Sequence, residues 1–248
     1  MVNYYPRIAD KLLADALQTS GAVLIEGPKW CGKTRTASET AQSVLYMQDA
    51  DNRESNIQAA SIKPSLLLKG EVPRLIDEWQ VAPVLWDAVR HEVDLRGEVG
   101  QFILTGSATP LMEDKIAHTG TGRFSRIKMR PMSLFEANES SGEISLKKLF
   151  EDDMEVACVS KLEIEEIANA VVRGGWPAPV VSRSAFAEKM AQDYVDSVVQ
   201  FDVSGVDGVE KNPQKMYALM RSLARNISTE ASYATLIKDM EGGERESV

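Results

Sequence analysis

The chain has 248 residues, a net charge of −9 at pH 7 and an ordinary mixture of 44% hydrophobic and 26% charged residues. Its length allows one large domain, or a medium-sized domain with a small one. The acidic balance argues against a broad, non-specific grip on nucleic acid, and no apolar run approaches the length of a membrane span. The first residues also lack the apolar core of a signal peptide, so we expect a cytoplasmic protein.

The beginning of the chain predicts a helix, a buried strand, a loop and a second helix. Apolar residues recur at helical spacing over residues 9–19, and residues 22–25 form an apolar run typical of a strand buried on both faces. The second helix is predicted at residues 33–41. The loop before it contains Gly27 and Gly32.

This loop fits the pattern G-x-x-x-x-G-K-[ST], which binds phosphate for physical reasons. The two glycines let backbone N–H groups approach an anion, and the helix N-terminus adds a partial positive charge. The Lys33 ammonium can reach the β- and γ-phosphates, and the Thr34 hydroxyl can ligate Mg²⁺. The residues expected to bind the nucleotide are Gly27, Pro28, Lys29, Trp30, Cys31, Gly32, Lys33, Thr34 and Arg35.

Two further expectations concern residues near this loop. Tyr4, Tyr5, Pro6 and Arg7 precede the first helix, and either they line an adenine pocket or they only anchor the N-terminus. Cys31, one of two cysteines, lies inside the loop, so we expect no structural disulfide and a reducing compartment.

Two adjacent carboxylates follow the third predicted strand, which ends at Asp77-Glu78. Because side chains alternate along a strand, the two point in different directions and suit different roles. We expect Asp77 to hold Mg²⁺ opposite Thr34, and Glu78 to polarise the water that attacks the γ-phosphate. The preceding elements are a strand at residues 44–47 and short helices at residues 53–60 and 64–69.

The fourth strand is predicted at residues 101–104, after a helix at residues 84–93, and it leads into Thr105-Gly106-Ser107. A polar residue at the carboxyl end of a central parallel strand lies at the edge where ligands bind. Thr105 or Ser107 therefore either senses the γ-phosphate or positions the water, or is only a turn residue that caps the next helix.

Two arginines follow a polar, glycine-containing segment at residues 111–122, which we expect to be a mobile loop. Arg123 and Arg126 are candidates for stabilising charge in the transition state, within the subunit or across a subunit interface. An ordinary surface role is the alternative for both. Residues 127–129 form the last predicted strand.

From residue 133 onward the pattern is helical. Ser160 and Glu163 predict a capping box for a helix that ends at Gly174 and is followed by a turn at Trp176-Pro177. Residues 241–248 are polar, and we expect them to be disordered. Further helices are predicted at residues 146–150, 186–200, 213–226 and 233–240.

The complete set of motifs resembles AAA-type ATPases of the AAA_14/DUF4143 family. The matching segments are YYPRIADKLL, GPKWCGKT, LIDEWQ, ILTGSATP, GTGRFSRIKMRPMSLFE and RGGWP. The resemblance implies a P-loop α/β fold of the ASCE or AAA type, in which helices flank a parallel sheet and a smaller all-α C-terminal region follows. It also implies a sensor strand between the phosphate-loop strand and the Asp-Glu strand.

The resemblance further implies an ATPase core at residues 1–132, a helical lid at residues 133–210 and a winged-helix-like segment at residues 211–248. In this interpretation the chain is truncated, because the wing and the DUF4143 domain of the family would follow. DNA as a partner rests on family analogy alone, and a homo-oligomer is a further expectation.

The sequence therefore predicts a protein that binds ATP with Mg²⁺ and hydrolyses it slowly. ATP is favoured over GTP because the chain has no Asn-Lys-x-Asp-like guanine reader. The alternatives are a nucleotide-gated interaction module without turnover and a DNA-linked ATPase. The residues expected in catalysis are Glu78, Lys33, Arg123 and Thr105, and those expected at the metal are Thr34 and Asp77.

Overall fold

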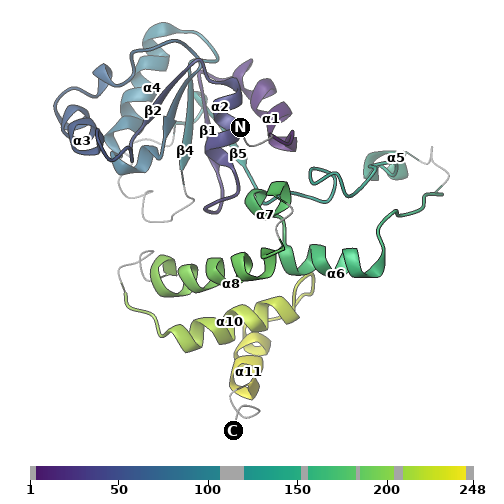
Figure 1. The fold of residues 1–248 in the computed structure, drawn as a ribbon. Coiled ribbons are helices and arrows are strands. Elements are labelled where there is room, and N and C mark those ends of the chain that lie inside the picture. Colours follow the sequence, from purple (N-terminus) through teal and green to yellow (C-terminus); the bar gives the residue numbers. More distant parts are fainter. Residues whose placement is uncertain (1–3, 107–119, 152–155, 183–184, 204–208, 244–248) are drawn as a thin grey trace. The chain divides into compact units, whose positions relative to one another are not determined.

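The computed structural model describes residues 4–106, 120–151, 156–182, 185–203 and 209–243 (Figure 1). The chain divides into two compact units, Met1–Glu188 and Lys189–Val248. The domain boundaries expected from the sequence stay predictions. Ser107 and most of the expected loop at residues 111–122 lie outside the described residues, as do residues 244–248 of the expected tail.

The first unit contains a parallel sheet, whose described strands have the order β2-β3-β4-β1-β5 (Figure 1). Because every pair is parallel, the carboxyl ends of the strands lie at one edge. β4 lies between the phosphate-loop strand β1 and the strand β3 that ends in Asp77, which confirms the strand order implied by the resemblance. The strands are β1 (Ala22–Glu26), β2 (Ser43–Tyr46), β3 (Arg74–Asp77), β4 (Phe102–Gly106) and β5 (Phe124–Lys128).

Helices cover both faces of this sheet because the strand side chains alternate. In β1, Leu24 packs in one apolar cluster with Trp86 of α4, whereas Ile25 packs in a second cluster with Leu13 of α1 and Ala37 of α2. A strand segment that is buried on both faces must be apolar, as residues 22–25 of β1 are. The flanking helices are α1 (Ile8–Leu17), α2 (Lys33–Thr40), α3 (Arg53–Ile62) and α4 (Val84–Arg96), with the 3-10 turns η1 (Pro64–Leu66) and η2 (Trp79–Val81).

The remaining described elements after β5 are helices. In the second unit α10 and α11 are joined by a Ser222 Oγ hydrogen bond to the Leu236 carbonyl (3.2 Å) and by an Arg225–Asp239 ion pair (3.0 Å). The α/β P-loop fold with a smaller all-α C-terminal region is thus confirmed. These helices are α5 (Leu146–Phe150), α6 (Ile164–Arg173), α7 (Pro177–Ser182), α8 (Ala187–Ser197), α10 (Pro213–Arg225) and α11 (Tyr233–Gly243), with a π-helical turn η4 (Val198–Asp202) after α8. No helix in the described ranges is long and apolar enough to cross a membrane.

Two local helix predictions are wrong. The capping box of α6 is formed by Glu163 and Glu166, and the Glu166 carboxylate accepts the Glu163 N–H at 2.8 Å, so the helix begins later than predicted. Ser160 instead accepts the N–H of Leu162 in a local turn. Pro177 opens α7 rather than forming a turn, because a proline at the first helical position loses no hydrogen bond.

Candidate functional site

The phosphate loop, residues 27–32, joins β1 to α2 at the carboxyl edge of the sheet. Gly32 has φ +96°, in the left-handed region that favours glycine. At Gly27 a Cβ would lie 2.3 Å from the backbone oxygen of Met129, so only glycine allows this approach to the end of β5. Glycine is therefore favoured at Gly32 by its backbone conformation and at Gly27 by the lack of space for a side chain.

Lys33 opens α2, and its side chain folds back onto the loop. Its Nζ donates to the carbonyl oxygens of Gly27 (3.0 Å) and Pro28 (2.9 Å), and the residue is only 5% exposed. A buried ammonium needs hydrogen-bond partners, and here the loop carbonyls accept hydrogen bonds from it. The positive charge is therefore held at the loop itself.

The other loop residues differ in exposure. Pro28, Lys29 and Trp30 are exposed at its tip, whereas Cys31 is buried in the core cluster with α1 and α2. Burial is the main cause of the raised pKa of the Cys31 thiol. Arg35 on α2 is exposed and forms an ion pair with Glu39 at 2.7 Å.

Three oxygen-bearing side chains meet beside the loop. Thr34 Oγ1 donates to Asp77 Oδ1 at 2.7 Å, and Thr105 Oγ1 donates to the same oxygen at 2.6 Å. The arrangement follows from the fold, because Asp77 ends β3, Thr105 lies opposite it on β4, and Thr34 is in the first turn of α2. Thr105 is fully buried and lies within β4.

Glu78 departs from the strand that Asp77 ends. Its backbone is left-handed (φ +57°, ψ +49°), which is uncommon outside glycine, and its carboxylate accepts a hydrogen bond from Gln80 Nε2. Burial, and then the charge of Asp77, raise the pKa of Glu78, while the Gln80 hydrogen bond and the charges of Lys33 and Lys29 oppose the rise. The two adjacent carboxylates thus have different partners.

The donor set beside the loop fits Mg²⁺, which prefers hard oxygen ligands. Because the Thr34 hydroxyl donates its hydrogen bond to Asp77, the lone pairs of its oxygen remain available to a cation. Within the described ranges, no group of three or more His, Cys, Asp or Glu side chains could hold a metal ion. Such a site would supply few protein ligands, which is typical of Mg²⁺ bound together with phosphates.

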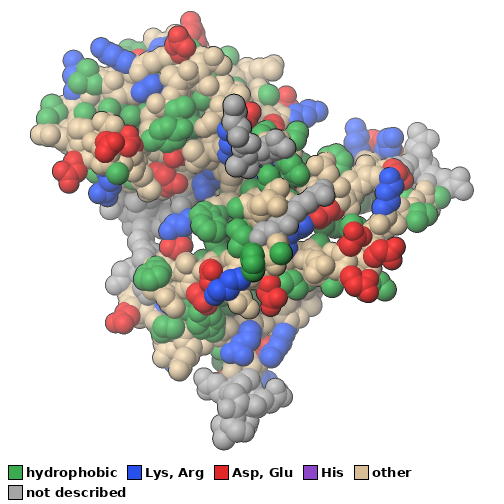
Figure 2. Space-filling view, viewed as in Figure 1, with side chains coloured by type: hydrophobic (Ala, Val, Ile, Leu, Met, Phe, Trp, Pro, Cys, Tyr) green, Lys and Arg blue, Asp and Glu red, His purple; other side chains and the backbone are tan. Residues whose placement is uncertain are grey.

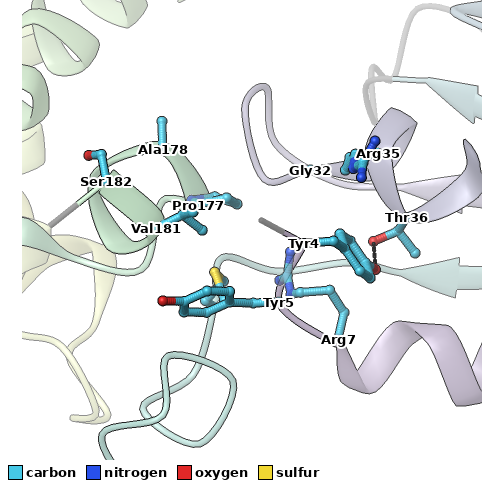
Figure 3. Close-up of a pocket in the computed structure, with 11 residues that line it drawn as sticks. Tyr4, Tyr5, Arg7, Gly32, Arg35, Thr36, Pro177, Ala178, Val181 and Ser182 are labelled. Atoms are coloured by element: carbon cyan, nitrogen blue, oxygen red, sulfur yellow. Dashed lines mark hydrogen bonds between the residues drawn. The ribbon is translucent and has the colours of Figure 1, made fainter. Parts of the chain in front are cut away.

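A cavity of about 490 Å³ opens next to the loop (Figure 3). Figure 3 shows Pro177 and Val181 of α7 on one side of it and Arg35 of α2 on the other, with Tyr4 and Tyr5 between them. The N-terminal segment both lines this cavity and is anchored. The Tyr4 hydroxyl donates to Asp10 at 2.5 Å and lies 3.0 Å from Thr36 Oγ1, and burial is the main cause of its raised pKa.

Arg123 is not placed with the other predicted residues. It precedes β5, at the opposite edge of the sheet from the phosphate loop, and pairs with Asp94 at 2.8 Å. Because β5 runs parallel to β1, the whole strand separates Arg123 from the loop. Arg126, within β5, pairs with Glu26 at 3.0 Å.

Sequence analysis missed several residues of the site. Gln80 and Glu136 lie at the ends of the matching segments LIDEWQ and GTGRFSRIKMRPMSLFE, but no role was predicted for either residue. Glu136 accepts a hydrogen bond from the buried Arg7 guanidinium. The α7 wall of the cavity was predicted as a turn, although Pro177 at a first helical position was a usable signal.

Two family comparisons match separate parts of the chain. Residues 19–138 match the AAA_14 family, described as an AAA domain, and residues 164–246 match DUF8612, described as a domain of unknown function. The first match includes the phosphate loop, Asp77, Glu78 and Thr105. The expected relation to DUF4143 is not shown, since the C-terminal match is to a different family. No curated protein matches the chain at a significant level.

Several solved structures are similar to this chain. One, a DNA replication initiation factor, is 17% identical with a TM-score of 0.38, and the alignment covers 97% of this chain and 84% of that one. Another is a signal transduction ATPase with numerous domains and a tetratricopeptide repeat sensor from Pyrococcus horikoshii. It is 14% identical with a TM-score of 0.41, and the alignment covers 96% of this chain and 39% of that one. Similarity at these TM-scores says nothing about what this chain binds.

Proposed function

We propose that this chain, whose residues 19–138 form an AAA-type P-loop domain, binds ATP with Mg²⁺ and hydrolyses it slowly. The observation that carries the proposal is the meeting of Thr34 and Thr105 on one oxygen of Asp77, beside a loop of the phosphate-binding pattern. A hydroxyl and a strand-end carboxylate at that position are the groups that hold Mg²⁺ in P-loop proteins.

In this proposal the loop amides and Lys33 bind the phosphates. Phosphate oxygens are stronger acceptors than the loop carbonyls that Lys33 contacts, so the ammonium exchanges those partners for the β- and γ-phosphates. Thr34 and Asp77 would hold Mg²⁺, directly or through water, and the ion neutralises charge on the β- and γ-phosphate oxygens when it is bound.

Glu78 would accept a proton from the attacking water, because it is the second carboxylate at this edge and Asp77 is committed to the two hydroxyls. Thr105 contacts both residues, through Oγ1 to Asp77 and from the Glu78 N–H at 3.4 Å. We therefore assign it a positioning role at the γ-phosphate.

The cavity between α2 and α7 would hold the nucleoside. Its walls include Tyr5, Met132, Pro177 and Val181, which offer an apolar surface and an aromatic ring to a flat base. Val181→Trp fills this space, so we expect it to weaken ATP binding at least tenfold and to leave inorganic tripolyphosphate binding unchanged. Isothermal titration calorimetry with both ligands would measure this; equal losses for the two would contradict the assignment.

The principal experiment measures nucleotide binding by calorimetry with and without Mg²⁺, and phosphate release, on the full chain. We expect Lys33→Ala to abolish ATP binding, and Glu78→Gln to retain binding while hydrolysis falls about 10²-fold or more. Hydrolysis by Glu78→Gln at the parent rate would overturn the role of Glu78. Binding of ATP by Lys33→Ala as tightly as by the parent chain would overturn the phosphate site.

A second candidate function is a nucleotide-gated interaction module without meaningful turnover. It is favoured by the contact between the Glu78 carboxylate and Gln80 Nε2, because a carboxylate held by an amide donor is restrained from reaching the attacking water. Steady phosphate release that is lost in Lys33→Ala would exclude this function. ATP binding without such release would establish it over the first.

DNA and self-association are separate proposals that rest on family analogy. Figure 2 shows acidic and basic side chains interspersed on the face it draws, which offers DNA no extended basic area there. Arg123 would act only on a second copy of the chain. In that case the hydrolysis rate per molecule rises with protein concentration in the parent and not in Arg123→Ala. The DNA-linked function has its own test: a hydrolysis rate that DNA does not increase at low salt would exclude it.

A further inference from the structure

The Arg7 guanidinium makes directed bonds to three separate parts of the first unit. Its Nη1 donates to the Cys31 carbonyl (2.8 Å), its Nη2 to the Arg130 carbonyl (2.8 Å), and its Nε to Glu136 Oε1 (3.0 Å). Arg7 is 7% exposed. A buried charge of this kind persists only where its geometry is good and its donors are satisfied, so the arginine holds a fixed position.

The Cys31 carbonyl lies inside the phosphate loop. In a planar trans peptide the C=O and the following N–H point in opposite directions, so a bond to the Cys31 oxygen also fixes the direction of the Gly32 N–H. The Gly32 amide belongs to the loop that the G-x-x-x-x-G-K-[ST] pattern uses to hold phosphate. Arg7 packs closely at this point, since a Cβ on Gly32 would lie 3.2 Å from Nη1.

Glu136 in turn holds Arg7. Besides the guanidinium it accepts the Ile8 N–H (2.8 Å) on Oε1, and the Ser133 N–H (2.8 Å) and hydroxyl (3.0 Å) on Oε2. These donors come from the first turn of α1 and from the segment after β5. The Glu136 carboxylate therefore fixes the Arg7 guanidinium relative to the end of the sheet. There the Arg130 carbonyl accepts the remaining hydrogen bond from Arg7.

We propose that Arg7, oriented by Glu136, is a positioning residue that presets the Gly32 amide of the phosphate loop for a polyphosphate. This inference rests on the proposed function of the same loop. It predicts a loss that concerns the phosphates specifically, although Arg7 also lines the nucleoside cavity. A purely structural arginine would instead weaken every ligand together, or none.

The test compares Arg7→Lys with the parent chain by calorimetry, using Mg²⁺-ATP, inorganic tripolyphosphate and adenosine as separate probes. Lysine keeps the charge but cannot hold three acceptors in a fixed fork. We expect ATP and tripolyphosphate affinities to fall about tenfold, and adenosine affinity to change less than threefold. Glu136→Gln is a milder variant, because it keeps an oxygen acceptor for Arg7. It replaces Arg7→Lys if that variant does not fold, and we expect it to lower the affinity for the two phosphate ligands about threefold.

The matched control is Arg96→Lys, which alters another multiply bonded arginine, at the opposite end of the sheet, in contact with Glu92 and Gln101. It should lower the unfolding midpoint and leave all three affinities unchanged. Suppose that the parent binds both phosphate ligands. The inference fails, and the proposed function stands, if the site variants bind these ligands as tightly as the parent, or if their affinity for adenosine falls by the same factor as their affinity for the phosphate ligands. If the parent binds neither ATP nor tripolyphosphate, both fail.

Discussion

Glu78 is the residue at which the environment acts most directly on the proposed chemistry. Burial and the charge of Asp77 raise its pKa, and the Gln80 amide works against them by donating to the charged form. A carboxylic acid with a raised pKa takes up its proton at a higher pH than usual, and the protonated form cannot accept a proton from water. The hydrolysis rate should therefore fall on the acid side above the ordinary glutamate pKa of 4.5.

Replacing Gln80 tests this relation. In Gln80→Leu the amide donor is lost, so the pKa of Glu78 should rise further and the acid limb of kcat should move to higher pH. The measurement is kcat against pH at saturating Mg²⁺-ATP. Gln58→Leu, on the exposed surface of α3, is the control and should leave the limb in place. An acid limb that moves to lower pH in Gln80→Leu would contradict the assignment.

The pKa of Glu136 is shifted in the opposite direction to that of Glu78, and the prediction that follows concerns stability. Burial alone would raise its pKa, but the N–H donors of Ser133 and Ile8 and the charge of Arg7 outweigh burial and lower it. Because the folded pKa is below the ordinary value of 4.5, the stabilisation is present above that value and is lost as the pH falls through the folded pKa. We expect Glu136→Gln to be about 1–3 kcal/mol less stable at pH 7.

Urea unfolding of both proteins between pH 7 and about pH 3 measures this difference. It should stay constant above pH 4.5 and shrink below that value, as the parent carboxyl gains its proton and resembles the glutamine amide in charge. A difference that stays constant over the whole range would show that the charge of Glu136 is not the stabilising feature.

Single residues were predictable from the sequence where a motif fixes their backbone position. Thr34 and Asp77 meet because Thr34 lies in the first turn of the helix after the loop and Asp77 ends a parallel strand two places away from β1 in the sheet. Arg7 and Gln80 act through side-chain hydrogen bonds that depend on packing across the fold. No local pattern encodes such contacts, so they could not be predicted from one sequence.

At the scale of elements, the phosphate loop depends on its fit against the end of β5. A Cβ at Gly27 would meet the Met129 backbone oxygen at 2.3 Å, and backbone cannot move aside as a flexible side chain can. We expect Gly27→Ala to displace the loop, with about 1–3 kcal/mol lost in stability and an ATP affinity at least tenfold weaker. Chemical unfolding and calorimetry measure the two effects separately.

Gly97→Ala is the matched control for this prediction. Gly97 ends α4 with φ +64°, and a Cβ there would meet nothing within 4 Å, so the change adds only conformational strain. It should cost about 1 kcal/mol in stability and leave ATP affinity unchanged. Equal ATP affinities in Gly27→Ala and Gly97→Ala would show that the close approach to β5 is not needed for binding.

The strands and the longer helices could be predicted from the pattern of apolar residues. β1, β3 and β4 are buried on both faces and so form apolar runs, whereas α4 is buried on one face and so has apolar residues at helical spacing. Helix starts were less predictable. Ser160 and Glu163 have the spacing of a capping box, but Glu163 and Glu166 have the same spacing, so the pattern alone did not select between them. The same is true of Trp176-Pro177, where a turn and a helix start share one sequence signal.

For the whole molecule, the division into two units makes a prediction about ligand-linked stability. The phosphate loop, the group of Thr34, Asp77 and Thr105, and the residues that line the cavity all lie in the first unit. A ligand stabilises only the folded unit that binds it, by about 2.7 kcal/mol when its concentration is 100 times the Kd. The second unit has no assigned contact with nucleotide, so its unfolding should not respond.

Differential scanning calorimetry of the full chain, with and without Mg²⁺-ATP, tests this division. We expect two transitions, of which the one from the first unit rises by about 5–10 °C, as 2.7 kcal/mol implies for a domain of this size. In Lys33→Ala neither transition should move, because the ammonium at the loop is gone. If nucleotide shifted both transitions of the parent equally, the second unit would have to share in binding, and the site described here would be incomplete without it.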